Sequence, residues 1–258
     1  YIGYGSNTEN QKWQLDDLSV YRNTITSTEI AVPKKGGDSS VEGGELYPGQ
    51  VFFSDFEREN DGTTIYGKGN FTDFGGNFGR VFQNVSGAQR SNYLILPEDV
   101  LSHSAETKEL SIGVWVNAAN AGASSDYMWA PLFSAYASGP ATDNGTPMFV
   151  CQYRGILQVN CNGWCDFTDA QNTNQVNGVY HDATDWLADK GWHYYTVTLT
   201  ETNAKVYFDG VLKNEWNVSG SGDGNVIGGL FSNGSDLKYI CLGGNQAWNW
   251  GDNDAGFM

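Results

Sequence analysis

The chain has 258 residues, of which 14 are basic and 30 acidic, so its formal net charge is −16. This charge argues against a nucleic-acid-binding protein, which needs a basic surface to displace counterions, and against binding to an anionic membrane surface. Hydrophobic residues make up 40% of the chain, which is enough for a folded core. No apolar run approaches the roughly 20 residues that cross a bilayer, so we expect no membrane span.

The chain divides into three parts by composition. Residues 31–50 are rich in Gly, Pro, Ser and charged residues and lack any periodicity, which is typical of a linker. They separate an N-terminal arm, residues 1–30, from a main body, residues 51–258. The arm begins with neither a signal peptide nor an initiator Met, so we expect a mature product or a fragment.

Apolar and polar residues alternate in short segments along the body, which indicates half-buried β-strands. In chain order we predict strands at 51–56, 80–84, 92–96, 110–117, 131–136, 147–153, 155–160, 194–200, 226–231 and 237–243. Residues 205–213 predict a hairpin, because Asp209-Gly210 supplies the positive φ angles of a type I′ turn. One or two helical turns are expected within 97–105 and 183–190. Many strands with so little helix predict an all-β, antiparallel two-sheet sandwich.

The four cysteines favour two disulfides. Cys161 and Cys165 enclose a loop short enough for a local bridge, and Cys151 and Cys241 lie in strand-like runs that a second bridge would join. A single disulfide and buried thiols without any bridge remain the alternatives, whereas a zinc site lacks both a nearby His and a CxxC pair. Disulfides would place the protein outside the reducing cytosol, as a secreted or cell-surface protein.

Five Asn-x-Ser/Thr sequons agree with that location, although chance accounts for about three of them. These N-glycosylation candidates are Asn70, Asn84, Asn144, Asn217 and Asn233.

Several segments of the body resemble motifs of one family. Residues 191–199 resemble a W-H-H-V-A-V-T strand, residues 206–210 an L-Y-V-D-G hairpin, and residues 110–117 an S-I-x-x-W-V strand. The opening strands have counterparts at 53–57, 79–84 and 93–97. Order and spacing across most of 51–245 resemble the laminin-G-like, concanavalin A-like jelly-roll family. The resemblance implies a jelly-roll body with an N-terminal β-strand arm.

The closing segment of that family occurs at the wrong end of this chain. Such domains close with aromatic-D-D-V-x-I-Y-N-R-A-L-S-x-x-E-I, a strand that pairs beside the opening strand. The body reaches Met258 without it, but Leu15–Ile30 resembles it closely. Tyr1–Asn7 also resembles Tyr239–Asn245, so the penultimate strand occurs twice and the closing strand once.

Three interpretations of the arm follow. In the leading one, Leu15, Leu18, Val20 and Tyr21 enter a neighbouring copy, because an open sheet edge invites strand addition. The protein is then an extracellular structural or adhesive subunit that assembles head to tail into a filament. In the second, the arm completes its own body as a circularly permuted, lectin-like domain. In the third, the arm ends a preceding domain of a tandem protein. The linker, roughly 66 Å when extended, reaches either target.

The resemblance also implies a calcium site. Relatives hold calcium between an acid of the opening strand and the Asp pair of the closing strand, which correspond here to Glu57, Asp16 and Asp17. Carboxylate oxygens suit Ca²⁺. The simpler interpretation is that these acids are solvated at strand ends.

The main functional rival is a secreted carbohydrate-binding module. Trp248, Trp250 and Asp252 combine aromatic faces with a polar group, as sugar sites do, and Trp129, Tyr136 and Trp164 are further candidates from loops. The simpler interpretation is that these aromatic residues pack the rim of the sandwich or a subunit contact.

An enzyme is the class we expect least. Glucanases on this fold carry E-x-D-x-x-E along one strand, whereas the alternating acids Asp55, Glu57, Glu59 and Asp61 lie where a strand enters a loop. Of the three His, His193 in the Trp-His strand is most simply structural.

Overall fold

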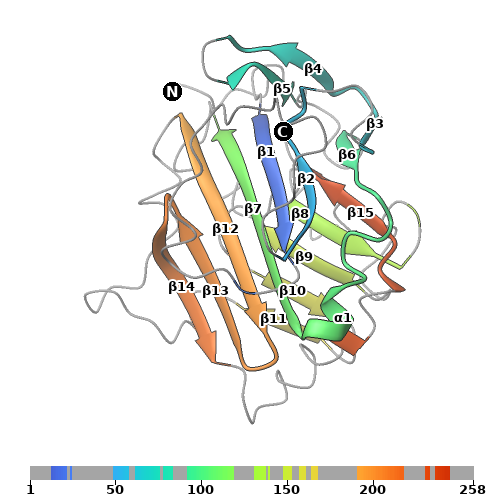
Figure 1. Cartoon of the computed structure of the whole chain (residues 1–258), viewed down its shortest axis with the longest axis vertical. Helices are drawn as coiled ribbons and strands as arrows, with labels where there is room; N and C mark the ends of the chain where they lie inside the picture. The colour runs from blue at the N-terminus through green and yellow to red at the C-terminus, as the bar shows by residue number, and fades with distance from the viewer. Residues whose placement is uncertain are drawn as a thin grey trace, which may run out of the picture.

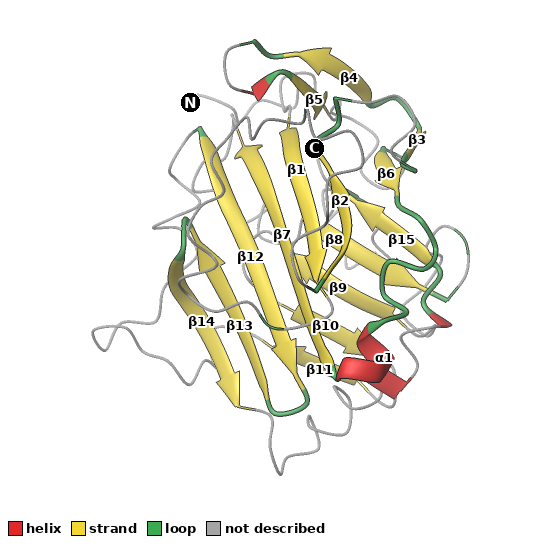
Figure 2. Ribbon diagram, in the orientation of Figure 1, coloured by secondary structure: helices red, strands yellow, loops and turns green. Residues whose placement is uncertain are grey.

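The computed structural model of the chain contains two antiparallel β-sheets packed face to face (Figures 1 and 2). The structure describes residues 13–21, 24, 49–57, 62–75, 78–83, 92–118, 131–137, 139, 148–152, 157–160, 164–167, 191–217, 230–232 and 236–244. Every described strand pair is antiparallel, which confirms the predicted all-β two-sheet sandwich.

Sheet A faces the viewer in Figure 1. Its strands are β1 (Trp13–Tyr21), β2 (Gln50–Ser54), β4 (Asn70–Asp73), β5 (Arg80–Gln83), β7 (Glu109–Ala118), β12 (Trp192–Thr200), β13 (Asn203–Phe208) and β14 (Val211–Asn217). They follow the order β14-β13-β12-β7-β1-β5-β4, and β2 also pairs with β1.

Sheet B lies behind sheet A. Its strands are β3 (Thr64–Tyr66), β6 (Tyr93–Ile95), β8 (Pro131–Tyr136), β9 (Met148–Gln152), β10 (Leu157–Asn160), β11 (Trp164–Phe167) and β15 (Tyr239–Leu242). Their order is β11-β10-β9-β8-β15-β6-β3, and α1 (Ser104–Thr107) covers one end of the sandwich.

Strand β1, from the N-terminal arm, lies in the middle of sheet A of the same chain. One of its edges pairs with β7, with Val20 opposite Ile112. The other edge pairs with β5 near Leu15 and with β2 from Leu18 to Tyr21. Leu18 and Val20 are fully buried, which stabilises the fold by about 1.5–3 kcal/mol for each side chain before ordering costs. The arm therefore supplies a strand that joins two parts of the sheet.

The core lies between the two sheets, where alternate residues of each strand point inward. In sheet A, the cross-strand neighbours Val20, Ile112, Val197 and Val206 all belong to it. Sheet B contributes residues such as Leu94, Ile240 and Phe149. The residues that follow these in sequence must face outward, and this alternation places the candidate site.

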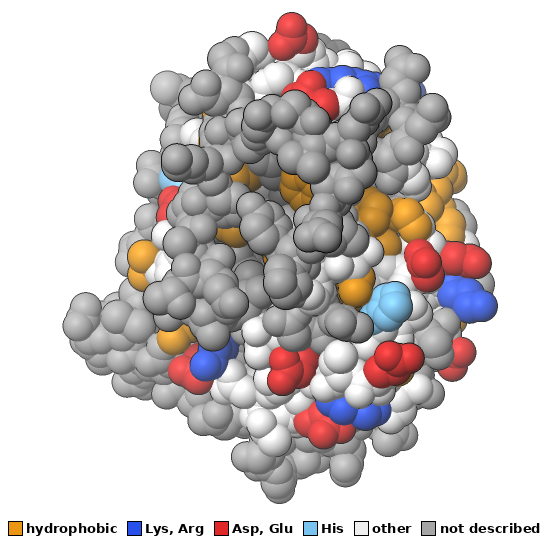
Figure 3. Space-filling view, in the orientation of Figure 1, with side chains coloured by type: hydrophobic (Ala, Val, Ile, Leu, Met, Phe, Trp, Pro, Cys, Tyr) orange, Lys and Arg blue, Asp and Glu red, His pale blue; other side chains and the backbone are white. Residues whose placement is uncertain are grey.

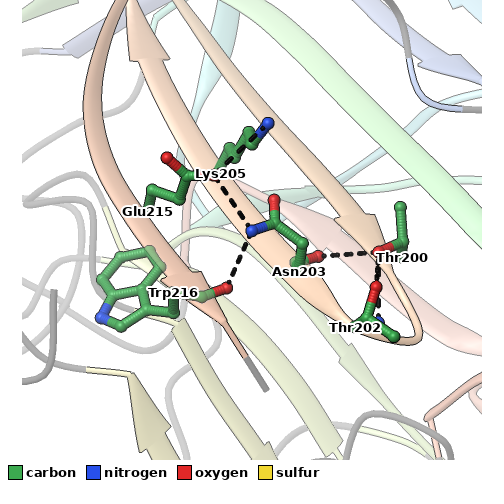
Figure 4. A network of polar contacts seen from close by, with 6 residues as sticks. All are labelled: Thr200, Thr202, Asn203, Lys205, Glu215 and Trp216. Carbon is green, nitrogen blue, oxygen red and sulfur yellow. Dashed lines mark hydrogen bonds and ion pairs between the residues drawn. The ribbon is translucent and has the colours of Figure 1, made fainter. Parts of the chain in front are cut away.

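Both ends of β13 are held by side chains. The predicted type I′ turn is supported by positive φ angles of 51° at Asp209 and 76° at Gly210. At the other end, the Asn203 side-chain amide donates to Glu215 Oε1 at 3.1 Å and to the Trp216 carbonyl at 3.2 Å (Figure 4). Lys205 Nζ lies 3.4 Å from the same Glu215 oxygen. These contacts fasten the edge strand β14 to its neighbour.

Not every predicted element is found. The strand predicted at 226–231 is wrong at its end, because Leu230–Ser232 forms a helical turn. A short apolar run fits a buried helical turn as well as a strand, so periodicity does not separate them. Strands β3, β4 and β11 were not predicted. The helical turn predicted at 183–190 lies outside the described residues.

The expected bridge between Cys151 and Cys241 is wrong. Both residues are buried thiols. Cys151 is paired with Phe133 and Cys241 with Ser134, so strand β8 lies between them. Phe133 and Ser134 are consecutive and point to opposite faces, and strands one removed lie about 10 Å apart, beyond the roughly 7 Å that a disulfide spans between Cα atoms. Cys161 lies outside the described residues, as does the side chain of Cys165.

Candidate functional site

The outer face of sheet A carries a row of small residues that runs across its central strands. Ser19 of β1, Gly113 of β7 and Thr196 of β12 are direct cross-strand partners, and we call them the polar row. The row ends at Phe53 of β2 on one side and at Tyr207 of β13 on the other. Because the neighbouring residues of each strand lie in the core, these side chains face away from it.

The polar row is shielded from solvent. The exposed fraction is 4% for Ser19 and 0% for Thr196, and the Thr196 hydroxyl is buried without a hydrogen-bond partner. A buried hydroxyl that lacks a partner costs free energy, so native structures rarely leave one. Phe53, at the end of the row, is 42% exposed. The row thus combines a polar group that needs a partner with an accessible aromatic ring.

Aromatic side chains stand beside the polar row on the same face. The Trp115 and Tyr194 rings lie 5.4 Å apart as cross-strand neighbours, and Phe78 stacks on Trp192 at 4.1 Å with an interplanar angle of 21°. Phe74 meets Trp192 edge to face at 5.6 Å. These five residues form what we call the aromatic wall. Its buried end is Tyr194 and its accessible end is Phe74, which is 44% exposed.

A tight loop holds the outer end of the aromatic wall. Between β4 and β5, the Phe74 N–H donates to the Gly79 carbonyl at 2.8 Å, and the Gly75 N–H donates to Asp73 Oδ1 at 2.8 Å. Gly75 has a φ of 77°, a conformation that glycine adopts without strain. The loop turns Phe74 and Phe78 back onto Trp192.

The wall and the row meet at Gly113. A Cβ atom at this position would collide with the Tyr194 phenol, so the tyrosine ring lies close across the glycine backbone. Glycine therefore leaves the space for this close approach. Tyr194 and Thr196 are two residues apart on β12, so the aromatic ring and the hydroxyl group lie on the same face of the sheet.

His193 makes contacts of the kind that the sequence interpretation as a structural residue expects. Its Nδ1 donates to Asp209 Oδ2 at 2.6 Å, and its ring stacks on Phe208 at 4.5 Å. Asp209 Oδ1 accepts a second hydrogen bond, from the Tyr194 N–H at 2.8 Å. Burial alone would raise the pKa of Asp209, but the hydrogen bonds from His193 and Tyr194 outweigh it and lower the pKa. The pair anchors the type I′ turn against β12.

The proposed calcium ligands lie in segments that adjoin the β1–β2 pairing. Leu18 pairs with Ser54, so the Asp16-Asp17 segment continues alongside the segment that leads from β2 to Glu57. Glu57 is exposed, and its Oε1 accepts a hydrogen bond from the Arg80 N–H at 2.7 Å. The side chains of Asp16 and Asp17 are not among those described. Within the described side chains, no three metal-ligating groups gather. The calcium site stays a prediction.

Several other predicted site residues lie outside the described part. Trp248, Trp250 and Asp252 are among them, as are Trp129, Asn84, Asn144 and Asn233, and nothing is described of the Trp164 or Asn217 side chains. Tyr136 is described and is 1% exposed, so its ring is not a surface platform. Asn70 of β4 is exposed, as an acceptor sequon must be. None of the described helices is long and apolar enough to cross a membrane.

Sequence reasoning missed the aromatic wall. Phe74 and Phe78 lie in a glycine-rich loop without periodicity, and only the sheet order brings them to Trp192. The polar row had a visible signal, because Thr196 and Thr198 fill the polar face of the strand predicted at 194–200.

Comparisons with known proteins add little about identity. No family profile matches the chain, and no curated protein matches it. Among solved structures, domain 4 of AbnA, a GH43 extracellular arabinanase from Geobacillus stearothermophilus in complex with arabinotriose, aligns with a TM-score of 0.39 and 13% identity over 72% of this chain and 75% of that chain. At this level of likeness the laminin-G-like resemblance stays an expectation, while the antiparallel β-sandwich itself is established by the strand pairing.

Proposed function

We propose that the protein is a carbohydrate-binding β-sandwich module and that the outer face of sheet A is its binding face. The observation that carries the proposal is the pair of exposed aromatic rings, Phe53 and Phe74, which stand on the same side of sheet A as the polar row. Binding sites for small molecules are typically lined by aromatic groups with a few placed polar groups.

The chemistry of this face suits a sugar ring. The C–H groups on one side of a pyranose or furanose ring carry partial positive charge and pack on the negative face of an aromatic ring. Sugar hydroxyls both donate and accept, and because the Thr196 side chain is 0% exposed, one of them would pair with its hydroxyl only where binding displaces the groups that bury it. Neither role needs a titratable group, and the proposal is for binding without a chemical step.

The charge of the protein favours a neutral glycan. With a net charge of −16, the chain repels polyanionic chains such as sulfated or uronic-acid polymers. On the face shown in Figure 3, the described Lys and Arg side chains that can be seen lie near the margins. A neutral polysaccharide is therefore the class that we expect.

Affinity gel electrophoresis and calorimetry with soluble β-glucan, xylan, mannan and arabinan test the proposal. We expect one of these to be retained, and Phe74→Ala to weaken its binding about tenfold, since loss of a stacking partner of about 1.4 kcal/mol corresponds to that factor. Val211→Ala is the matched control, because Val211 is 55% exposed but lies on β14, away from the wall.

Thr196→Val separates a ligand contact from a packing role. Valine keeps the shape but removes the hydroxyl, so a purely structural Thr196 predicts unchanged binding and equal or higher stability. The proposed contact predicts weaker binding at equal or higher stability. Retention of no neutral polysaccharide would overturn the proposal.

Strand donation between copies is the second candidate. It is favoured by one observation: β1 is a central strand that reaches the sheet through a long linker, so the same strand from a neighbour would fill the same place. Against it, Tyr21 lies opposite Gln50, so the end of β1 and the start of β2 are neighbours within the chain. Such a tether gives its own strand an effective concentration in the millimolar range.

A cysteine trap distinguishes the two routes. Gln14 and Asn117 are cross-strand partners on β1 and β7. In Gln14→Cys/Asn117→Cys, an intrachain strand gives a disulfide-linked monomer on a non-reducing gel, whereas donation between copies gives a ladder. Each single variant is the control for bridges to the native cysteines.

A further inference from the structure

Three tyrosines form a connected group on the outer face of sheet B. Tyr66 of β3 and Tyr93 of β6 are cross-strand partners whose rings stack at 4.7 Å with an interplanar angle of 11°. Tyr93 meets Tyr239 of β15 edge to face at 6.3 Å, and the two phenol oxygens lie 3.0 Å apart. Leu94 and Ile240, which follow them in sequence, point into the core, so the tyrosines point away from it.

Tyr66 is the accessible member of this group. It is 39% exposed, whereas Tyr93 beneath it is 0% exposed. One face of the Tyr66 ring is occupied by Tyr93, so the orientation of the ring is set and its accessible surface is on the other side. A ring that is already ordered loses little side-chain entropy when it binds.

The Tyr93 and Tyr239 phenols carry two O–H groups, and the hydrogen bond between them uses only one. Burial raises the pKa of both Tyr93 and Tyr239, so both stay neutral and each carries one proton. A single hydrogen bond between the two oxygens uses one of these protons. Tyr93 is fully buried and Tyr239 partly exposed, so we assign Tyr93 as the donor, which leaves the Tyr239 O–H available beside the Tyr66 platform.

We propose that Tyr66 and Tyr239 form a second sugar-binding site, on the opposite sheet from the first. The sugar ring packs on the free face of Tyr66, and the Tyr239 O–H donates to one of its hydroxyls. The proposal uses the ligand class of the proposed function but not its site. With the two outer faces pointing in opposite directions, one molecule would bind two glycan chains (Figure 1).

The surroundings fit a sugar better than a protein partner. The exposed large hydrophobic residues among those described are Phe53, Phe74, Val211 and Tyr66, and only Tyr66 belongs to sheet B. Stable protein interfaces bury about 800 Å² on each partner around an apolar centre. A single exposed aromatic ring, in a stretch of chain where Thr64, Lys68 and Asn70 are also exposed, offers a platform for one sugar ring instead.

The test uses beads coated with whichever neutral polysaccharide the unaltered protein retains, together with equilibrium binding to its soluble oligosaccharides. The unaltered monomer should agglutinate the beads. Tyr66→Ala should abolish agglutination and halve the binding stoichiometry, while Tyr66→Phe keeps the ring and should behave as the unaltered protein. Tyr239→Phe should weaken the second site about tenfold. Circular dichroism and the thermal midpoint of each variant check folding.

The outcomes separate this proposal from the proposed function. If Phe74→Ala halves the stoichiometry and Tyr66→Ala does not, the sheet A site stands and the second site is overturned. If Tyr66→Ala halves it and Phe74→Ala does not, the second site stands and the sheet A site is overturned. Equal loss in Tyr66→Ala and Tyr66→Phe contradicts the stacking role, and no binding to any neutral polysaccharide overturns both sites.

Discussion

In each sheet, one central strand pairs with the strands on both of its sides. The two central strands are connected to the rest of the chain differently. Strand β15 joins β8 to β6 in sheet B and lies within the body. Strand β1 lies between β7 on one side and β2 and β5 on the other in sheet A, and the linker, residues 31–50, connects it to the body. The same structural role is thus filled by a fixed strand in one sheet and by a tethered strand in the other. Sheet A should therefore depend on a segment that can be removed without cutting the body.

Of the changes considered, removing the arm should have the largest effect on the fold, because it removes the central strand of sheet A. Without residues 1–30, sheet A loses β1, and the core loses Leu18 and Val20. We expect a body with an exposed apolar groove that aggregates, and we expect a peptide covering Leu15–Ile30 to suppress the aggregation. Size-exclusion chromatography with light scattering measures both. A peptide in which Leu18 is replaced by Asp is the control, and equal rescue by both peptides would contradict the assignment of the groove.

Alanine substitutions at Gly113 in sheet A and at Gly244 beside sheet B compare how tightly the backbone is packed at the two places. A Cβ atom at Gly244 would lie 2.7 Å from the backbone oxygen of Asn92, which cannot rotate away. At Gly113 the obstacle is the phenol end of Tyr194, a side-chain group that can rotate away. We expect Gly244→Ala to lower the free energy of unfolding by about 2–3 kcal/mol and Gly113→Ala by about 1 kcal/mol. Urea unfolding checks the order, and the reverse order would show that Tyr194 is held more firmly than its contacts indicate.

Calcium should stabilise the junction between the arm and the body. If Asp16, Asp17 and Glu57 bind Ca²⁺ in the folded state only, an ion concentration of 100 times the dissociation constant adds about 2.7 kcal/mol. We expect a higher thermal midpoint in millimolar calcium than in chelator, and no such rise in Asp17→Asn. Equal midpoints with and without calcium would remove the site.

The His193–Asp209 contact predicts a smaller, pH-dependent effect. The pKa of Asp209 is lowered in the folded state, so its contribution is present above the unfolded value of about 3.9 and is lost as the pH falls through the folded value. The Asp209 side chain is 40% exposed, so solvent screening limits the effect, and we expect Asp209→Asn to cost about 1 kcal/mol at neutral pH. Unfolding titrations at pH 7 and pH 3 should show the difference shrinking with acid. Asp99→Asn, on another surface, is the control.

Cys151 should differ from Cys161 and Cys165 in its reactivity toward alkylating reagents. Burial raises the pKa of the Cys151 thiol to about 12, although a hydrogen bond to Tyr195 opposes the shift. Cys151 should therefore resist alkylation until the protein unfolds, because the thiolate is the reactive form. Cys161 and Cys165 are still predicted to be bridged. Intact mass and peptide mapping before and after reduction test both statements, and two alkylated thiols at 161 and 165 in the native protein would contradict the bridge.

The sequence was most informative where a single strand carries its own pattern. The alternation at 110–117 and 194–200 and the Asp209-Gly210 turn predicted their elements, because period-two burial and positive φ are local properties. Strands β3 and β11 are too short to show a period. The predicted bridge between Cys151 and Cys241 is wrong for another reason. The order of strands in sheet B places β8 between them, and a local sequence pattern does not reveal that order. The wall from Phe74 to Tyr194 likewise depends on which strands become neighbours.

The position of β1 has a consequence for synthesis on the ribosome. Of its pairing partners, β2 is made first and β7, which ends at Ala118, last, so about 100 residues are made after Tyr21 before the β7 edge can pair. At rates of about 5–20 residues per second, the strand waits roughly 5–20 s. During that delay, adjacent ribosomes on one message hold nascent chains at different stages, and a waiting strand can meet an older chain whose β7 already exists. The order of synthesis therefore favours exchange of β1 between nascent chains. In the completed chain, the linker favours pairing of β1 with its own body.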